Sequence, residues 1–318
     1  MSCKLWRTTP RIAQGIRRID LEYVFPSGRQ ALAFAVKYLG LSRVHRIAIP
    51  EWSSRCVVNA VAAFATPIPM REVLNHHIQV DAVLLYEQWG WPSFKHHYPE
   101  VEARFPHAKL ILDYVDSADV LSRQDLLSDV AKSGQLALVS LGKTLGFSGG
   151  GLLAAKDGLV HAPAPMQETW QHKIAESIEF GHDAMFDYVT KTYVTRLPTI
   201  LSDQVMAGDC WSAFKEEAQA RRNHLALAER SALSRHWPKW MFEALESEHC
   251  APGIIPLLVS ASEQITVQKR CDKLDIETAC LNFNFSDHPL KLDYRPCLAI
   301  PIHGEMDEEK LNGIASVL

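Results

Sequence analysis

The sequence lacks the features that mark several large classes of protein. Lys and Arg number 33 against 37 for Asp and Glu, a net charge of −4, so no positive excess points to a nucleic-acid or anionic-membrane surface. No apolar run is long enough to cross a membrane, and the opening MSCKLWRTTPRIAQ lacks the apolar core of a signal peptide. We therefore expect no nucleic-acid partner, no membrane partner and a cytoplasmic location.

Cysteine and histidine do not form the patterns that bind metals. The seven cysteines are scattered, odd in number and never spaced C-x-x-C, which favours small buried side chains in a reducing compartment over disulfides or a zinc site. The adjacent pairs His76-His77 and His96-His97 lack helical metal-ligand spacing and predict surface or loop histidines. We expect no bound metal.

The glycine-rich nucleotide motifs are incomplete. Gly142-Lys143-Thr144 has the last three residues of a phosphate-binding loop, but Ala137 stands where G-x-x-x-x-G-K-T requires its first glycine. The glycines between 146 and 151 do not form G-x-G-x-x-G either. The sequence therefore gives no support for an ATPase or a nicotinamide enzyme.

What the sequence does contain is an alternation of short apolar runs and helical stretches. Helical spacing of apolar residues predicts helices over 28–40 and 53–65. Near-continuous apolar runs are typical of strands buried on both faces of a mainly parallel sheet. The runs that predict such strands are 45–50, 81–86, 108–114, 135–141 and 151–157.

The second half of the chain changes character twice. From about residue 164 to 235 the pattern is mostly helical, and after Pro252 strand-like runs return at 254–260, 277–286 and 297–302, before a final helix over 307–318. We therefore predict an α/β fold in two parts. A large domain spans 1–205, and a helical connection with a small α+β domain spans 206–318.

Chemistry-bearing residues fall where strands of such a sheet would end, the edge at which open α/β sheets bind ligands. Asp113 ends an apolar strand and is either a cap or turn residue or the partner of a buried cation. Lys143 follows the strand at 135–141, where a desolvated amine can form a Schiff base; a solvated loop lysine is the alternative. The glycines just beyond it, between 146 and 151, allow tight backbone turns near a ligand.

A fourth feature opens the helix at 28–40. The segment Ser27-Gly28-Arg29-Gln30 follows the strand-like LEYVF at 21–25 and offers free N–H groups and a positive dipole to an anion. An ordinary serine cap beside a glycine is the alternative. Together, a phosphate-binding helix start, a carboxylate and a lysine about thirty residues later are what pyridoxal 5'-phosphate (PLP) requires.

Six segments, in order along the chain, strengthen this interpretation. They are FPSGRQALAFAVKYLGL, RIAIPEWSSRCVVNAVAAFATPIP, GWP, ILDYVDSAD, SLGKTLGFSGGGLLAAKDG and CLAIPIHGEMDEEKLNGIASVL. In order and spacing they resemble the DegT/DnrJ/StrS branch of the fold type I PLP enzymes, the sugar aminotransferases. The resemblance runs from about residue 20 to the end, with poor matching between about 160 and 250.

The resemblance implies an enzyme and the roles of its residues. Lys143 would form the Schiff base with PLP, and Asp113 would pair with the pyridine nitrogen. Ser140 and the segment 27–30 would hold the phosphate: Ser27, Gly28, Arg29 and Gln30. The implied reaction is transfer of an amino group from a glutamate-like donor to a keto acceptor such as a nucleotide sugar, in a fold type I homodimer with a mainly parallel seven-stranded sheet.

Three positions depart from the family pattern, and at one of them Arg29 replaces a threonine whose hydroxyl would bind the phosphate. Asp116 stands where the family usually has Gln or His near the phenolic oxygen of the cofactor. The ring-stacking aromatic aligns with Ser54, so Trp52, two residues earlier, is the candidate substitute. Asp116 and the missing stacking ring leave a PLP-dependent dehydratase or lyase open as an alternative. The short block before Ser27 and the poorly matching middle leave open a degenerate homologue that binds without catalysis.

Other candidates have structural interpretations. Trp89 and Trp91 either line a substrate cleft or pack in the core. Arg295 is expected to form a structural salt bridge, with carboxylate binding as the alternative. Arg221 and Arg222 lie in a charged helical stretch and predict a solvated face.

Overall fold

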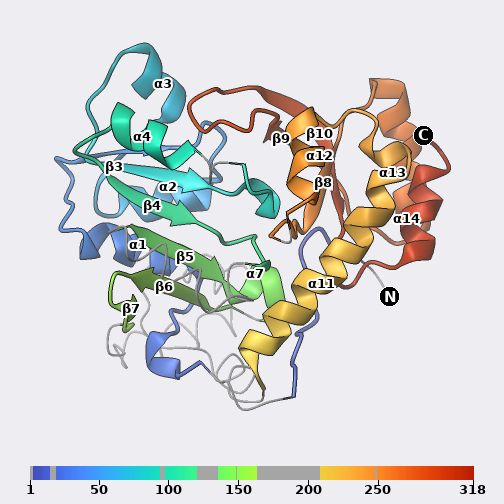
Figure 1. The fold of residues 1–318 in the computed structure, drawn as a ribbon, viewed down its shortest axis with the longest axis horizontal. Coiled ribbons are helices and arrows are strands. Elements are labelled where there is room, and N and C mark those ends of the chain that lie inside the picture. Colours follow the sequence, from blue (N-terminus) through green and yellow to red (C-terminus); the bar gives the residue numbers. More distant parts are fainter. Residues whose placement is uncertain are drawn as a thin grey trace, which may run out of the picture.

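The computed structural model describes residues 3–14, 19–93, 97–119, 135–147, 149–162, 208–247 and 249–318. Within these ranges two sheets form, each with its own helices (Figure 1). No helix among the described residues combines the length and apolarity needed to span a bilayer.

The larger sheet has seven strands in the order β2-β1-β3-β4-β5-β6-β7. The first five run parallel to their neighbours, whereas β6 and β7 pair antiparallel. Parallel strands share one carboxyl edge, so the ends of β1, β3, β4 and β5 meet on the same side. The strands are β1 Arg46–Ile49, β2 Thr66–Pro69, β3 Ala82–Tyr86, β4 Lys109–Asp113, β5 Leu136–Ser140, β6 Gly151–Ala155 and β7 Gly158–Leu159.

Helices cover both faces of this sheet because its strands are apolar on both sides. Along β3, Val83 and Leu85 belong to one buried cluster, and Ala82 and Leu84 belong to another. Side chains alternate between faces along a strand, so each cluster needs its own helices. One face packs on α1 (Gly28–Tyr38) and α2 (Arg55–Ala62), and the other on α3 (Met70–Asn75), α4 (Tyr98–Arg104) and the start of α11 (Cys210–Glu229).

The smaller sheet is antiparallel, with the order β8-β10-β9. A third buried cluster joins it to its helices and to the second half of α11. Figure 1 shows α11 running diagonally beside the small sheet, with α13 and α14 at the right. The elements of this part are η4 Ala232–Ser234, α12 Lys239–Leu245, β8 Ile254–Leu257, α13 Ala261–Lys273, β9 Ala279–Asn284, β10 Tyr294–Pro301 and α14 Glu308–Ala315.

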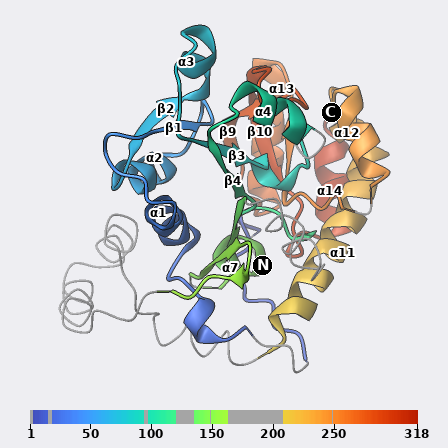
Figure 2. The same ribbon diagram turned by 60° about the vertical axis from the view of Figure 1, so that its left-hand side comes forward.

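A short 3₁₀ helix, η2 (Gln88–Gly90), ties the two sheets together. The amide of Gln88 donates from Nε2 to the carbonyl of Asn282 (2.7 Å) and accepts at Oε1 from the N–H of Asn284 (3.0 Å). The carbonyl of Trp89 accepts the N–H of Gly253 at 2.9 Å. Figure 2 shows β9 and β10 of the small sheet beside β3 and β4 of the large one, and the site forms at this junction.

Most elements predicted from the sequence are confirmed, including all five predicted strands of the large sheet, the three of the small sheet and the final helix. Their bounds are shorter than predicted, except that β10 begins three residues earlier, at Tyr294. The strand-like interpretation of 21–25 is wrong: η1 (Leu21–Tyr23) is a 3₁₀ helix, and only Phe25 forms a bridge, to Gly151. Pro26 follows and has no N–H to continue a ladder.

The predicted domain boundary after residue 205 lies outside the described residues, as does most of the helical stretch predicted from 164. The two sheets with separate cores support a division of the chain into a large and a small domain, which remains our proposal.

Candidate active site

A cavity of about 280 Å³ lies at the carboxyl ends of β1, β3 and β4, opposite β9 of the small sheet. Asp113 at the end of β4 and Lys143 in α7 (Leu141–Leu145) both line it. Trp6 from the N-terminal segment and Cys280 from β9 close other sides. The cavity therefore lies at the edge where an α/β sheet places its ligands.

Asp113 is a buried carboxyl at the end of a strand whose apolar residues are buried on both faces. Its Oδ1 accepts the N–H of Val115 at 3.1 Å. Burial raises the pKa of Asp113 to about 7, even though the positive charge of Lys143 and the Val115 N–H both favour the ionised form. The sequence left two roles open for Asp113, a turn residue and the partner of a cation. The structure supports both, because Asp113 accepts a turn hydrogen bond from Val115 and lies near the charge of Lys143.

The Lys143 amine is held by a different acid. Its Nζ lies 3.1 Å from Oδ1 and 3.3 Å from Oδ2 of Asp116, and this carboxylate is itself buried. The Lys143 side chain is 36% exposed, which lies between the desolvated amine and the solvated loop lysine that the sequence left open. The side chain lines the open cavity, which accounts for its exposure.

Two further side chains donate to Asp116. The hydroxyl of Tyr86, the last residue of β3, donates to Oδ2, and the indole Nε1 of Trp6 donates to Oδ1 at 3.3 Å. Burial raises the pKa of Tyr86 well above its usual range, and the charge of Asp116 adds to the effect, so Tyr86 is a hydrogen-bond donor here. Asp116 is therefore a carboxylate with three donors, one of them Lys143.

The N-terminus of α1 lies beside Ser140. Ser27 caps the helix by accepting the N–H of Gln30 at 3.3 Å, and Ser140 caps α7 by accepting the N–H of Lys143 at 3.2 Å. A Cβ atom on Gly28 would lie 3.4 Å from the Cβ of Ser140, so the two caps are adjacent. The predicted phosphate-binding residues Ser27, Gly28 and Ser140 are thus brought together, with Arg29 half-buried and Gln30 buried in the same first turn.

The glycines after Lys143 serve backbone packing. Gly150 forms a bridge with Ser27, and a Cβ on Gly151 would come within 2.6 Å of the Ser27 backbone. Only glycine permits this approach, which holds β6 against the start of α1. The sequence predicted tight backbone turns near a ligand at these glycines, and the close approach in the structure is to the backbone of Ser27.

Trp52 and Ser54 both line the cavity beyond the end of β1. Trp52 is 60% exposed, which leaves its ring free to contact a molecule in the cavity. Trp89 lines the cavity as well and packs against Phe283 at 4.8 Å, whereas Trp91 is fully buried between Trp237 and Trp240. Trp89 therefore both lines the cavity and packs in the core, whereas Trp91 is a core residue alone.

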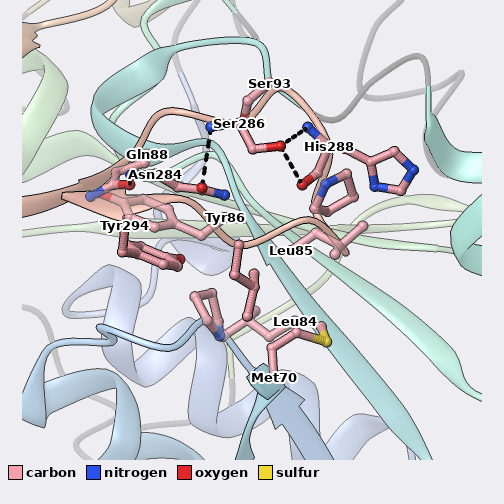
Figure 3. A pocket seen from close by; sticks show the side chains of 13 residues that line it. Met70, Leu84, Leu85, Tyr86, Gln88, Ser93, Asn284, Ser286, His288 and Tyr294 are labelled. Atoms are coloured by element: carbon pink, nitrogen blue, oxygen red, sulfur yellow. Dashed lines mark hydrogen bonds between the residues drawn. The ribbon is translucent and has the colours of Figure 1, made fainter. Parts of the chain in front are cut away.

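A smaller hollow of about 40 Å³ adjoins the cavity and shares Leu84, Tyr86 and Gln88 with it (Figure 3). Its other side is the loop after β9, where Ser286 donates to the carbonyl of His288 and accepts its N–H. Polar side chains from the small sheet and its loop therefore lie close to the carboxyl edge of the large sheet.

His288 belongs to a cluster that joins the two sheets. Its Nε2 lies 2.6 Å from Oε2 of Glu100 in α4, and Nδ1 of His97 lies 3.3 Å from Oε1 of the same carboxylate. The N–H of Leu290 donates to Nδ1 of His288 at 3.1 Å, which assigns the ring proton to Nε2. His288 is therefore a donor to Glu100, and the cluster is a hydrogen-bonded contact between α4 and the loop after β9.

The prediction of a solvated face at Arg221 is wrong. Its side chain is 2% exposed, its Nε donates to Oε1 of Glu217 at 2.9 Å, and its Nη1 donates to the carbonyl of Asp116 at 2.7 Å. The helix α11 packs against both sheets, so one charged side is enclosed. Arg295 forms the expected salt bridge, with Asp293 at 2.6 Å.

Tyr86 and Trp6 are the site residues that the sequence analysis missed. Tyr86 is a polar residue at the end of a predicted strand, the same signal that identified Asp113. Trp6 carries no such signal, since 110 residues separate it from Asp116.

A family model described as "Putative PLP-dependent aminotransferase" matches residues 11–238, more than half of the chain. The chain belongs to this family. It is therefore a PLP-dependent aminotransferase, and PLP is its cofactor, as the sequence predicts.

Solved structures share the fold across nearly the whole chain. The protein titled "Putative sugar aminotransferase Spr1654" from Streptococcus pneumoniae, in its PMP form, has 13% identity and a TM-score of 0.59, over 97% of this chain and 92% of that one. NtdA from Bacillus subtilis, with bound PMP, has 14% identity and a TM-score of 0.59 over 93% and 72%.

DesV from S. venezuelae has 15% identity and a TM-score of 0.53, over 92% of this chain and 82% of that one. Comparison with the curated proteins finds no match. The likenesses confirm the predicted fold type I architecture, and with the family match they confirm the resemblance to the DegT/DnrJ/StrS-type enzymes.

Proposed function

We propose that this aminotransferase moves an amino group from an amino-acid donor such as glutamate to a keto sugar, with Lys143 as the residue that bonds the cofactor. One observation supports this most strongly: the Lys143 amine and the buried Asp113 carboxyl line the same cavity, at the carboxyl edge of the sheet. The adjacent N-terminus of α1 is suited to bind a phosphate.

The residues present fit PLP. Asp113 is a buried acid whose pKa of about 7 reflects missing solvation, so a protonated ring nitrogen would stabilise its ionised form. Gly28 leaves space that a Cβ would fill, since that atom would lie 3.2 Å from Val115 and 3.4 Å from Ser140. We assign the phosphate to Ser140 and the first turn of α1, namely Ser27, Gly28, Arg29 and Gln30, and the ring face to Trp52.

When bound, PLP supplies an aldehyde that condenses with amines and a ring that withdraws electrons. The chain supplies the proton transfer. Lys143, displaced from the cofactor by the amino donor, accepts a proton at Nζ and returns it. Asp116 holds that Nζ within 3.1 Å, and Tyr86 orients the Asp116 carboxylate.

A sugar is our choice of acceptor for two reasons. Spr1654, a structural neighbour, is titled a sugar aminotransferase. In this chain Gln88 and Asn282 line the cavity, and hydrogen-bonding groups there suit the hydroxyls of a sugar. We also propose a homodimer and a cytoplasmic location, as expected from the sequence.

The test is spectroscopic and chemical. We expect the purified chain with PLP to absorb visible light, and the band to disappear on addition of glutamate as pyridoxamine phosphate forms. Borohydride should fix the cofactor to the peptide that contains Lys143, as measured by mass spectrometry. Lys143→Ala should lose the fixed cofactor and roughly 10²–10⁴-fold in rate, whereas Lys156→Ala, in an exposed turn, should change neither.

The same experiment separates the alternatives. Bound cofactor without pyridoxamine phosphate would favour elimination or dehydration, for which the Asp116 carboxylate beside Lys143 is the motivating observation. A chain that takes up no PLP in a titration would contradict the proposal altogether.

A further inference from the structure

The N-terminal segment of residues 3–11, which we call the strap, runs from the small sheet to α7. At one end the N–H of Cys3 donates to the carbonyl of Asp275, and the carbonyl of Cys3 accepts from Glu277, both at 2.8 Å. At the other end the N–H of Arg11 donates to the carbonyl of Leu145, the last residue of α7, also at 2.8 Å. The strap is therefore fixed by backbone bonds on both sides of the site.

The side chains beside Trp6 fix its direction. Leu5 is buried in the core of the small sheet, and Arg7 is buried in an ion pair with Glu217 at 3.1 Å. Burial alternates along this part of the strap, with Leu5 and Arg7 buried and Trp6 exposed between them. With Leu5 and Arg7 both buried, Trp6 is left to project into the cavity, which it lines.

The indole of Trp6 contacts both members of the Lys143–Asp116 pair. Its ring centroid lies 5.3 Å from Nζ of Lys143, within the range of a cation–π contact. Its Nε1–H donates to Oδ1 of Asp116 at 3.3 Å. One rigid side chain therefore bounds the amine and orients the carboxylate that holds it.

We propose that Trp6 is a positioning residue, whose indole keeps the Lys143 amine against Asp116. This inference rests on the proposed role of Lys143 in proton transfer. Trp6 lies outside the residues that the family model matches, so family membership does not assign it this role. The strap thereby completes the site from within the same chain.

The first test follows the reaction with glutamate in a single turnover. Losing a hydrogen bond and a cation–π contact should slow this step about tenfold in Trp6→Ala. Trp6→Phe keeps the ring and should recover most of that rate. We expect Trp6→Ala to lower the maximal rate. The glutamate concentration at half-maximal rate and the affinity for PLP should each change less than about threefold.

A double-mutant cycle tests whether Trp6 acts through Asp116. The tenfold loss in Trp6→Ala should fall to less than about threefold once Asp116→Asn is present. An additive effect of the two changes, or a Trp6→Ala effect confined to half-maximal glutamate concentration, would overturn the proposal.

The second test needs no cofactor, so it remains valid if the proposed function fails. The apo-chain is acetylated with limiting N-hydroxysuccinimide acetate, and mass spectrometry gives the ratio of Lys143 to Lys239 labelling. The Lys239 side chain is 90% exposed and serves as the internal reference. Trp6→Ala should raise this ratio at least about threefold, because the amine loses its cover and its cation–π contact.

Two controls make the labelling specific. Trp6→Phe should keep the ratio of the parent. Phe242→Ala removes an aromatic residue that is 37% exposed, much like Trp6 at 36%, but Phe242 packs on Trp237 away from the cavity, so it should leave the ratio unchanged. An unchanged ratio in Trp6→Ala, or an equal rise in Phe242→Ala, would refute the positioning role.

Discussion

Two deeply buried carboxyls in this enzyme have opposite electrostatic surroundings. Asp113 lies at the cavity, where burial raises its pKa to about 7. Glu217 is fully buried in α11, yet its pKa is lowered: desolvation acts to raise it, but the charges of Arg221 and Arg7 and the N–H of Gly304 outweigh it. Burial alone therefore does not decide the protonation of an acid here.

The difference separates a structural acid from a functional one. Glu217 has its cations within the chain, with Nη1 of Arg7 at 3.1 Å and Nε of Arg221 at 2.9 Å, and so it stabilises the fold as an anion. Asp113 is desolvated on a cavity wall, and its ionised form awaits the charge that a ligand would bring. The sequence places Asp113 after an apolar run and Glu217 in a charged helical stretch, but it does not show that Glu217 is the acid enclosed with its cations.

The largest expected effect comes from neutralising the structural acid. Glu217→Gln leaves Arg7 and Arg221 buried without their anion, and breaking a buried pair in this way costs about 3–5 kcal/mol. Urea unfolding of the apo-chain at pH 7 measures it. Glu216→Gln is the matched control, because the Glu216 carboxylate is half-exposed and makes only a long contact, 3.8 Å, with Arg11. An equal loss in both variants would show that Glu217 has no special role.

The next effect distinguishes the two acids by pH. Burial raises the pKa of Asp113 from 3.8 in the unfolded chain to about 7 in the folded one. The stability that the protonated carboxyl contributes is therefore complete below about pH 4 and is lost as the pH rises through 7. Asp113→Asn should therefore be more stable than the parent apo-chain at pH 8, with a difference that shrinks by at most about 1.4 kcal/mol per pH unit towards pH 4.

Glu217 should behave in the opposite sense. Its folded pKa is lowered, so its contribution is present above the unfolded pKa and is lost as pH falls through the folded one. Unfolding curves for Asp113→Asn, Glu217→Gln and the exposed control Asp157→Asn, measured from pH 8 down to about pH 3, test both signs, because the range then extends below the unfolded pKa of Glu217, 4.5. A parent chain and an Asp113→Asn variant that lose stability in parallel would contradict the raised pKa.

The sequence predicted the sheet edge of the site well, because strand ends are local features. Asp113 and Lys143 were found from the apolar runs that precede them, and the structure places both on one cavity. Tyr86 carries the same signal at the end of β3 and could have been found in the same way.

What could not be predicted depends on contacts between distant parts of the chain. The spacing of Glu217 and Arg221 is visible as an i, i+4 pair, but such pairs are usually solvated. They are buried because α11 packs on both cores and because Gly304 and the strap close over them. Trp6 meets Lys143 for the same reason, since the backbone bonds at the two ends of the strap set its place.

The smallest effect comes from an acid between these extremes. Asp119 pairs with two cations, with Nη1 of Arg222 in α11 at 3.2 Å from Oδ1 and Nδ1 of His249 at 3.2 Å from Oδ2. About a quarter of the Arg222 side chain is exposed, so water partly replaces the lost pair. We expect Arg222→Gln to cost about 1 kcal/mol or less in urea unfolding, and to leave the glutamate reaction unchanged.

Arg222→Lys, which keeps the charge, should recover part of that loss. A cost for Arg222→Gln as large as that of Glu217→Gln would show that solvent access does not set the strength of these pairs. Glu217 and Asp119 could then not be ranked by how far each ion pair is enclosed, and the low cost expected for the partly exposed pair would have to be abandoned.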